Sequence, residues 1–336
     1  MNWFELSDER KRLLLDQASA RLQASPNAIE KDWWVTIVLK AVFNTAYAEE
    51  IIFKGGTSLS KSWQLIKRFS EDIDLAINRR VLGFGEQLTI TQNKLLKRAG
   101  AEFTSTVFKD AIERELYELG VPKEAISIYA KPARPDFPEV DPQELFVEYV
   151  SVLGQDAYLL PSVKIEMSVR SLTEPHFRRN ISSLIDEAIP GQNYSDEPFT
   201  VRAIDPRITI LEKIFLLHEE FTKPADRIRT ERMSRHLHDL ERTMESACCN
   251  NAINDGELYL KICAHRKQMI RQKHVNYDHH AQSTIQFIPP VEWMSVYKAD
   301  YEKMKLSMFR GEVPGFEEVI FKLNMLQAWI RNGGKE

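Results

Sequence analysis

The chain has 336 residues, of which 43% are hydrophobic and 28% charged. This composition is that of a globular protein, and the length suits two packed parts. The formal net charge of −4, from 45 basic and 49 acidic residues, argues against a protein that coats nucleic acid, although it leaves room for a local basic face. The three cysteines, Cys248, Cys249 and Cys263, are too few and too clustered for a disulfide framework, which favours a reducing compartment.

The N-terminal segment has no basic start followed by an apolar run, so a signal peptide is not expected. No apolar stretch approaches the roughly 18 residues that would span a membrane. We therefore expect a cytoplasmic protein with no membrane partner. No Cys or His spacing resembles a structural zinc site.

The first third of the chain changes from helical to mixed patterning. Residues 7–22 predict an amphipathic helix, and a second helix begins near Pro26 and runs through Val42. Residues 51–53 predict a short strand that stops at a double glycine. A helix over 57–66 and a strand over 73–77 follow.

The remaining elements divide into a mixed part and a helical part. After a long helical stretch over 87–119, the expected strands are 125–130, 145–152, 161–169 and 199–203, with a proline-rich connector at 131–138. The helices expected after residue 205 are 206–220, 229–247, 256–272, 291–308 and 314–331. The pattern predicts an α/β fold: N-terminal helices over 1–50, a mixed sheet flanked by helices over 51–205, and an all-helical domain over 206–336.

A double glycine between a strand and a helix is the first feature with a chemical implication. Gly55 and Gly56 let the backbone turn tightly and approach a ligand, and the free N–H groups of the following helix favour phosphate. Thr57 and Ser58 can cap that helix and donate hydroxyls to the same phosphates. Lys61, one turn later, can neutralise their charge.

Paired carboxylates follow on the next strand. Asp72 and Asp74 are two residues apart, so their side chains share one face. Their mutual repulsion is relieved by a cation, and Mg²⁺ bound by one or two carboxylates plus substrate phosphates meets that need. Taken alone, the glycine segment is typical of a simple turn and Asp-x-Asp of a solvated strand edge. Together and in this order, they favour phosphoryl transfer.

The segments 55–61 (GGTSLSK) and 68–75 (RFSEDIDL) resemble the AbiEii/AbiGii-type nucleotidyltransferase toxins. These toxins are related to the mycobacterial MenT enzymes and belong to the DNA polymerase β-like nucleotidyltransferase superfamily. Residues 29–34 (IEKDWW) also resemble the segment that opens these proteins. The resemblance covers the ordered motifs from about 29 to 244 and implies a nucleotidyltransferase-type sheet.

The resemblance implies three further site residues. A third carboxylate on a later strand corresponds to Glu166, with Lys164 on the same face, although an exposed Lys-Glu stripe is an alternative. A lysine in one helix and an aspartate in the next correspond to Lys213 and Asp239. Histidines replace part of the family pattern around Asp239. Alternatively, Lys213 is solvated on its helix, and Asp239 forms a surface ion pair with Arg235, at i−4, or with Arg242, at i+3.

The implied activity is Mg²⁺-dependent transfer of a nucleoside monophosphate from a nucleoside triphosphate (NTP) to an acceptor hydroxyl, with release of pyrophosphate. The resemblance further implies a toxin encoded with an antitoxin, and an acceptor that in some relatives is the 3′ end of tRNA. Two alternatives stay open: a non-catalytic nucleotide-binding regulator of the same fold, and a small-molecule nucleotidyltransferase.

Two other groups of residues attract notice. The stretch 261–274 carries five basic residues and no acid, which indicates either a solvated helix face or a phosphate-binding surface for RNA. Nearby arginines could extend that face: Arg227, Arg229, Arg232 and Arg235. Three histidines lack regular metal-ligand spacing, so surface or core positions are expected for them: His274, His279 and His280.

Overall fold

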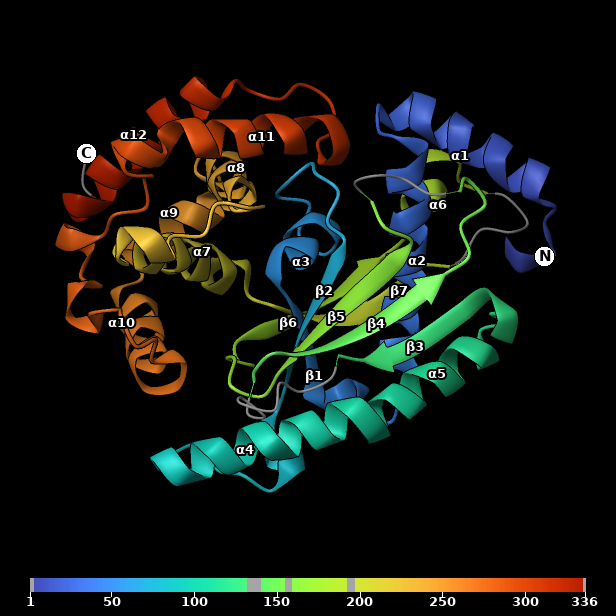
Figure 1. Cartoon of the computed structure of the whole chain (residues 1–336), viewed down its shortest axis with the longest axis horizontal. Coiled ribbons are helices and arrows are strands. Elements are labelled where there is room, and N and C mark those ends of the chain that lie inside the picture. The colour runs from blue at the N-terminus through green and yellow to red at the C-terminus, as the bar shows by residue number, and fades with distance from the viewer. Residues whose placement is uncertain (1–2, 132–139, 155–158, 192–196, 335–336) are drawn as a thin grey trace. The chain divides into compact units, whose positions relative to one another are not determined.

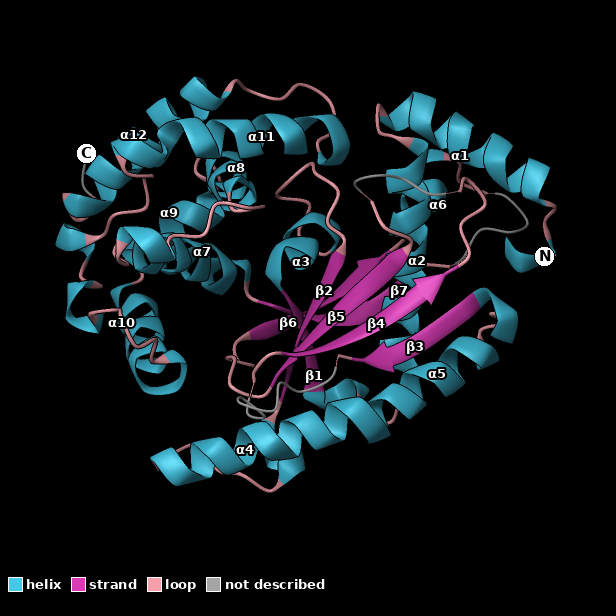
Figure 2. Cartoon of the chain, viewed as in Figure 1, coloured by secondary structure: helices cyan, strands magenta, loops and turns pink. Residues whose placement is uncertain are grey.

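The computed structural model describes residues 3–131, 140–154, 159–191 and 197–334 (Figure 1). The chain forms two compact units: Met1–Trp63 with Arg68–Ile204, and Gln64–Lys67 with Asp205–Glu336. The first unit holds a mixed sheet with flanking helices, whereas the second is built from helices (Figure 2). The predicted fold class is therefore confirmed.

The first unit is organised around a seven-stranded sheet in the order β3-β4-β5-β2-β1-β7-β6. Its strands are β1 Ile51–Lys54, β2 Asp72–Ile77, β3 Ile126–Ala130, β4 Gln143–Tyr149, β5 Ser162–Ser168, β6 His176–Ile181 and β7 Phe199–Ile204. The central strand β2 runs antiparallel to β1 and parallel to β5. The sheet thus brings β2 and β5 together although about 90 residues of sequence lie between them, which matters because both carry predicted site residues.

The two faces of the central strands differ in polarity. Along β5 and the first half of β2, alternate residues such as Ile73 and Ile165 are buried, and the residues between them are only half-buried. This alternation follows from the two-residue period of a strand, which sends successive side chains to opposite faces. One face therefore packs into the core, and the other presents Asp72, Asp74 and Glu166.

The first unit contains six α-helices among its described residues, and the second of them in chain order is largely buried. They are α1 Asp8–Leu22, α2 Pro26–Asn44, α3 Gly55–Lys61, α4 Ile90–Phe103, α5 Lys109–Glu118 and α6 Leu184–Ala188. The helix α2 begins with Ser25, whose side chain accepts the N–H of Ala28, and with Pro26 in the first turn. It packs against α1, α5, α6 and β5, and most of its residues are buried.

Most predicted elements of the first unit are confirmed, with differences at their ends. The helix predicted over 57–66 covers only Gly55–Lys61, because the chain then turns and Gln64 adopts a positive φ of 53°. The long helix predicted over 87–119 is α4 and α5 joined by a π-helical turn over Thr104–Phe108. The strand β6 and the short α6 were not predicted. The connector predicted at 131–138 lies almost wholly outside the described residues.

The second unit contains six α-helices among its described residues: α7 Pro206–Phe221, α8 Ser234–Thr243, α9 Ala247–Asn254, α10 Gly256–His265, α11 Met294–Met308 and α12 Phe316–Arg331. The helix predicted over 229–247 begins only at Ser234. The carboxylate of Asp300, on α11, accepts the N–H groups of Arg232 and Ser234 and thereby fixes that start. A distant residue therefore caps α8, and the local sequence could not have indicated it. Within the described residues, no helix combines the length and apolarity that crossing a membrane requires.

Candidate active site

Three predicted carboxylates lie together on the half-exposed face of the sheet. Asp72 and Asp74 project from β2, and the parallel pairing with β5 places Lys164 opposite Asp72 and Glu166 opposite Asp74. The expected third carboxylate is therefore adjacent to the Asp-x-Asp pair. On the next strand, Glu144 lies opposite Glu166, which adds a carboxylate that the sequence did not single out.

Lys164 lies among these carboxylates. Its Nζ is 2.5 Å from Oε1 of Glu166 and 3.4 Å from Oδ2 of Asp72. Burial alone would lower the pKa of Lys164, but the carboxylates of Asp72, Glu166 and Asp74 outweigh it and raise that pKa. This face of the sheet therefore already holds one cation, so the exposed Lys-Glu stripe considered above does not describe it.

The donor set suits a divalent cation that also binds phosphate. Within the described residues, no three Asp, Glu, His or Cys side chains are arranged to hold a metal ion by themselves. Mg²⁺ rarely needs such a cage, because one or two carboxylates, waters and substrate phosphates complete its coordination. Asp72 and Asp74 offer two carboxylates on one face, and the ammonium of Lys164 shows that a positive charge is accommodated there.

The glycine turn approaches the carboxylates directly. Gly55 has φ +74°, and a Cβ built on it would lie 1.9 Å from Oδ2 of Asp74. Only a residue without a side chain fits there, so the first turn of α3 comes close to Asp74. At Gly56 a Cβ would lie 2.6 Å from Nη2 of the buried Arg68, so the absence of a side chain at Gly56 leaves space for the Arg68 guanidinium.

Thr57 and Ser58 do not have the contacts expected of them. The helix α3 begins at Gly55 with no side-chain cap, so the prediction that Thr57 or Ser58 caps it is wrong. The buried Thr57 hydroxyl hydrogen-bonds to the Ser70 hydroxyl, at 2.7 Å, and to the carbonyl oxygen of Asp72. The Ser58 hydroxyl is buried and has no hydrogen-bond partner among the described residues. The backbone N–H groups are therefore the groups that this turn could still offer to a phosphate.

The ammonium of Lys61 forms buried contacts within the first unit. It lies 2.8 Å from Oδ1 of Asp32, both side chains being about 6% exposed, and it donates to the carbonyl of Ser182 at 3.1 Å. This placement gives no support to the expectation that Lys61 neutralises phosphate charge. It instead fixes the C-terminal end of α3 to α2.

Consecutive charged residues of α2 position the site. Lys31 pairs with Glu71, directly before β2, at 2.7 Å. Asp32 binds Lys61 and also accepts the N–H of Leu184 at 2.8 Å.

Glu30, next to them on α2, accepts the Ser151 hydroxyl at 2.6 Å and the N–H of Val152 at 2.8 Å. The segment 29–34 carried the family resemblance, but its sequence gave no indication of these partners. All three charged residues are buried, so this part of α2 acts as a framework for the site.

Lys213 and Asp239 form a buried ion pair in the second unit. Nζ of Lys213, on α7, lies 2.8 Å from Oδ2 of Asp239, on α8, and 3.5 Å from Nδ1 of His236. The side chains are 7% and 0% exposed, so a solvated Lys213 and a surface pair between Asp239 and an arginine are both wrong. The second unit thus brings these two predicted residues together.

Part of the predicted basic face is buried. Arg266 forms two hydrogen bonds with Glu219, at 2.6 and 2.7 Å, inside the second unit. His280 also contacts Glu219, at 3.0 Å, and is buried, whereas His274 and His279 are exposed. Burial, with a smaller effect of His280, lowers the pKa of the neighbouring His218 to about 4.

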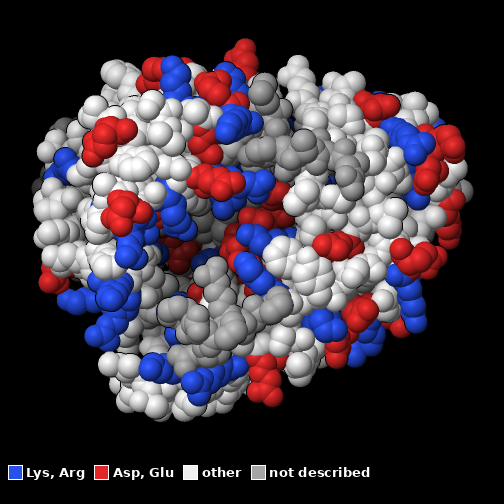
Figure 3. Space-filling model, viewed as in Figure 1, with Lys and Arg blue, Asp and Glu red and all other residues white. Residues whose placement is uncertain are grey.

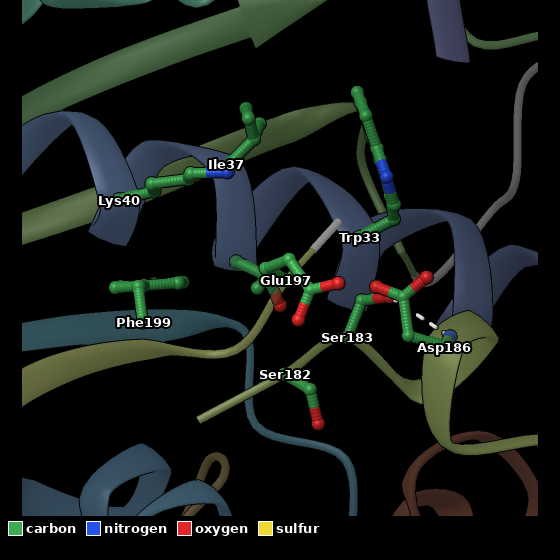
Figure 4. Close-up of a pocket in the computed structure, with 9 residues that line it drawn as sticks. Trp33, Ile37, Lys40, Ser182, Ser183, Asp186, Glu197 and Phe199 are labelled. Carbon is green, nitrogen blue, oxygen red and sulfur yellow. Dashed lines mark hydrogen bonds between the residues drawn. The ribbon is translucent and has the colours of Figure 1, made fainter. Parts of the chain in front are cut away.

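A small pocket beside α2 is unrelated to this chemistry. It is lined by Trp33, Thr36, Ile37, Lys40, Ser182, Ser183, Asp186, Glu197 and Phe199 (Figure 4). Its volume of about 10 Å³ is enough for about one water molecule and far too small for a nucleotide. The Ser183 hydroxyl donates to Asp186 at its rim, as part of the cap of α6.

A comparison with protein-family models agrees with the motifs. The family described as "Nucleotidyl transferase AbiEii toxin, Type IV TA system" matches residues 37–322, well over half of the chain. A solved structure titled "Crystal structure of JHP933 from Helicobacter pylori" is similar over 92% of this chain and 94% of that one, with 15% identity and a TM-score of 0.45. No curated protein matches the chain.

The family match identifies the class as nucleotidyl transferase. The chain belongs to the AbiEii toxin family of type IV toxin–antitoxin systems, which confirms the predicted resemblance and implies an antitoxin partner.

Proposed function

We propose that the protein transfers a nucleoside monophosphate from an NTP to an acceptor hydroxyl, with release of pyrophosphate. One observation carries this proposal: Asp72, Asp74 and Glu166 share one face of adjacent strands, and the Gly55 turn touches Asp74. Paired carboxylates beside a backbone turn suit the binding of a metal–triphosphate complex.

Asp72 and Asp74 are the residues that would hold Mg²⁺, with Glu166 beside them. When bound, the ion would neutralise charge on the phosphates and polarise the oxygens that react. The backbone N–H groups at Gly55 and Gly56 would bind phosphate oxygens, because the first N–H groups of a helix have no partner within the helix.

Lys213 and Asp239 are proposed to take part in the same reaction. Lys213 would bind and orient phosphate oxygens through its fixed positive charge. Asp239 would hold the ammonium in place, as their 2.8 Å ion pair supports.

The acceptor is proposed to be an RNA end, as a tRNA 3′ hydroxyl would provide. In the first unit, an open groove of about 470 Å³ along the edge strand β6 is lined by Arg178, Arg179, Asn180 and Thr200. The guanidinium of Arg179 lies 4.7 Å above the ring of Trp63, and such basic and aromatic pairs suit nucleotide chains.

In the second unit, Lys261, on α10, and Arg271 and Lys273, which follow α10 in the sequence, are exposed. Figure 3 shows several Lys and Arg side chains on the side of the molecule where α10 lies in Figure 1. These side chains are also available to a phosphate backbone, even though Arg266 of the same stretch is buried.

Incubation with each α-labelled NTP, Mg²⁺ and total cellular RNA tests the proposal. We expect label to enter RNA with stoichiometric release of pyrophosphate, and Asp72→Asn to abolish both while leaving the fold intact. A regulator that only binds nucleotide would retain the label without releasing pyrophosphate. Label on a small molecule instead of RNA would favour a small-molecule nucleotidyltransferase.

A further inference from the structure

The ammonium of Lys164 lies between two carboxylates of the candidate metal-binding face, those of Asp72 and Glu166. It contacts Glu166 at 2.5 Å and Asp72 at 3.4 Å. The strand register holds it there, because Lys164 is the direct partner of Asp72 on the neighbouring parallel strand. Its side chain is 27% exposed, so the ammonium can move toward solvent without unfolding the strand.

An ammonium and a divalent cation compete for the negative charge of these carboxylates. Each is attracted to the negative oxygens of Asp72 and Glu166, and each loses part of its attraction when the other is already near. A free metal ion must therefore displace Lys164 or share the carboxylates with it.

A metal ion that binds together with a triphosphate need not compete with Lys164 in the same way. The phosphate oxygens bring negative charge that can accept the hydrogen bonds of the Lys164 ammonium. The lysine then changes from a competitor of the metal to a partner of the nucleotide, so that the metal and the nucleotide favour each other's binding.

We propose that Lys164 competes with divalent metal for Asp72 and Glu166, and that it thereby makes tight metal binding depend on nucleotide. This inference rests on the proposed function, since it takes that carboxylate face as the metal site. Lys164 is a positioning residue in this scheme, because it acts through the two carboxylates.

Titration of the full chain with Mn²⁺ in the absence of nucleotide, followed by the EPR signal of free Mn²⁺, tests the competition. We expect Lys164→Gln to bind Mn²⁺ about tenfold more tightly than the wild type, which corresponds to about 1.4 kcal/mol. Addition of a non-hydrolysable NTP analogue should tighten Mn²⁺ binding in the wild type and much less in Lys164→Gln.

Lys109→Gln is the matched control. Lys109 also pairs with a carboxylate, that of Asp110 at 2.8 Å, and its side chain is 25% exposed, but it lies on α5. Its substitution should leave Mn²⁺ affinity unchanged. Should Lys164→Gln fail to fold by circular dichroism, Lys164→Arg tests the same idea, because a guanidinium that can bind carboxylates in a bidentate manner should weaken Mn²⁺ binding.

Equal or weaker Mn²⁺ binding by folded Lys164→Gln would overturn the competition, as would tighter binding by Lys164→Arg. Pyrophosphate release by the wild type is measured separately. If the wild type releases pyrophosphate and Lys164→Gln binds Mn²⁺ with the same affinity as the wild type, only the role of Lys164 is contradicted. If Lys164→Gln binds Mn²⁺ more tightly but the wild type releases no pyrophosphate, the proposed function is contradicted instead.

Discussion

Gly55 and the carboxylate of Asp74 share a space that leaves no room for a side chain at position 55. A Cβ there would lie 1.9 Å from Oδ2 of Asp74, so Gly55→Ala must displace either the turn or the carboxylate. We expect Gly55→Ala to lower pyrophosphate release by at least about a hundredfold, because a small displacement of reacting groups costs that much. Initial rates at saturating NTP and Mg²⁺ measure it.

Gly83→Ala provides the control for backbone strain. Gly83 also has a positive φ, of +82°, but a Cβ there would meet nothing within 4 Å. Both substitutions therefore force a left-handed conformation on alanine, at about 1–2 kcal/mol, and only one of them meets a carboxylate. Equal activity loss in the two variants would mean that strain alone is responsible.

The Lys213–Asp239 pair requires a design that separates stability from chemistry. Lys213→Met leaves a buried carboxylate without its lysine and should cost about 3–5 kcal/mol in the free energy of unfolding. The double variant Lys213→Met/Asp239→Leu removes both charges and should recover most of that loss. Urea denaturation checks both expectations.

The activity of the double variant then shows what the pair does. If Lys213 acts on phosphate, the double variant should be stable and yet at least about a hundredfold slower, as after loss of one preorganised charge. Near-normal turnover in a stable double variant would assign the pair to structure alone.

His218 gives the second unit a dependence of stability on pH. Its pKa is about 4 in the folded chain, mainly because of burial, against 6.5 for an unperturbed histidine. Between these values the unfolded chain binds a proton that the folded chain does not, so stability falls as the pH drops from 6.5 to 4.

This component amounts to about 3 kcal/mol, from 2.5 pH units at 1.36 kcal/mol each. His218→Asn, whose amide oxygen can accept the N–H of Gln286 in place of the ring nitrogen, should lose it. Chemical denaturation at a series of pH values measures the difference, with the exposed His279→Asn as control. A similar pH slope in wild type and His218→Asn would contradict the assignment.

At the scale of elements, α2 helps to position the site while carrying none of the predicted site residues. Asp32→Asn would leave the ammonium of Lys61 without its buried carboxylate, and we expect a loss of about 3–5 kcal/mol in the free energy of unfolding. Asp8→Asn removes the partner of Lys11 at the surface, where the two groups are 3.5 Å apart, and should change stability by less than about 1 kcal/mol. Thermal unfolding of both variants compares a buried with an exposed Asp–Lys pair.

Elements with a strong local pattern were predictable, and those fixed by distant contacts were not. The strand β1 is a short apolar run that stops at a double glycine, and β2 begins with alternating acidic and apolar residues, so their existence followed from sequence. The edge strand β6 (HFRRNI) has four exposed residues in succession and therefore shows no alternation. The start of α8 depends on Asp300, about 66 residues away, and no local signal indicates it.

The same distinction applies to the candidate site. The Asp72–Asp74 face followed from a two-residue spacing, and Glu166 from a family pattern. The ion pairs of Lys61 with Asp32 and of Lys31 with Glu71 could not be predicted. Each pair joins residues about 30 to 40 positions apart, which come into contact only in the completed fold.

For the whole molecule, the net charge of −4 means that an RNA acceptor must be held by local basic surfaces. Arg178→Glu, on the groove along β6, should weaken RNA binding and reduce the slope of log affinity against log salt by about one. Arg114→Glu is the control, since Arg114 is also exposed and has a glutamate at 3.4 Å, as Arg178 does. Filter binding at several salt concentrations measures both, and equal effects would count against the groove.

The contacts of α2 also have a consequence for biosynthesis. Among the described residues, the side chains of Glu30, Lys31 and Asp32 form their hydrogen bonds and ion pairs with residues later in the chain: Lys61, Glu71, Ser151, Val152 and Leu184. Until the ribosome has translated the segment that contains these partners, the charged side chains of α2 lack part of their hydrogen bonds and ion pairs, and α2 cannot adopt its final packing. This part of the fold should therefore be completed only after Leu184, in the second half of the chain, has emerged from the ribosome.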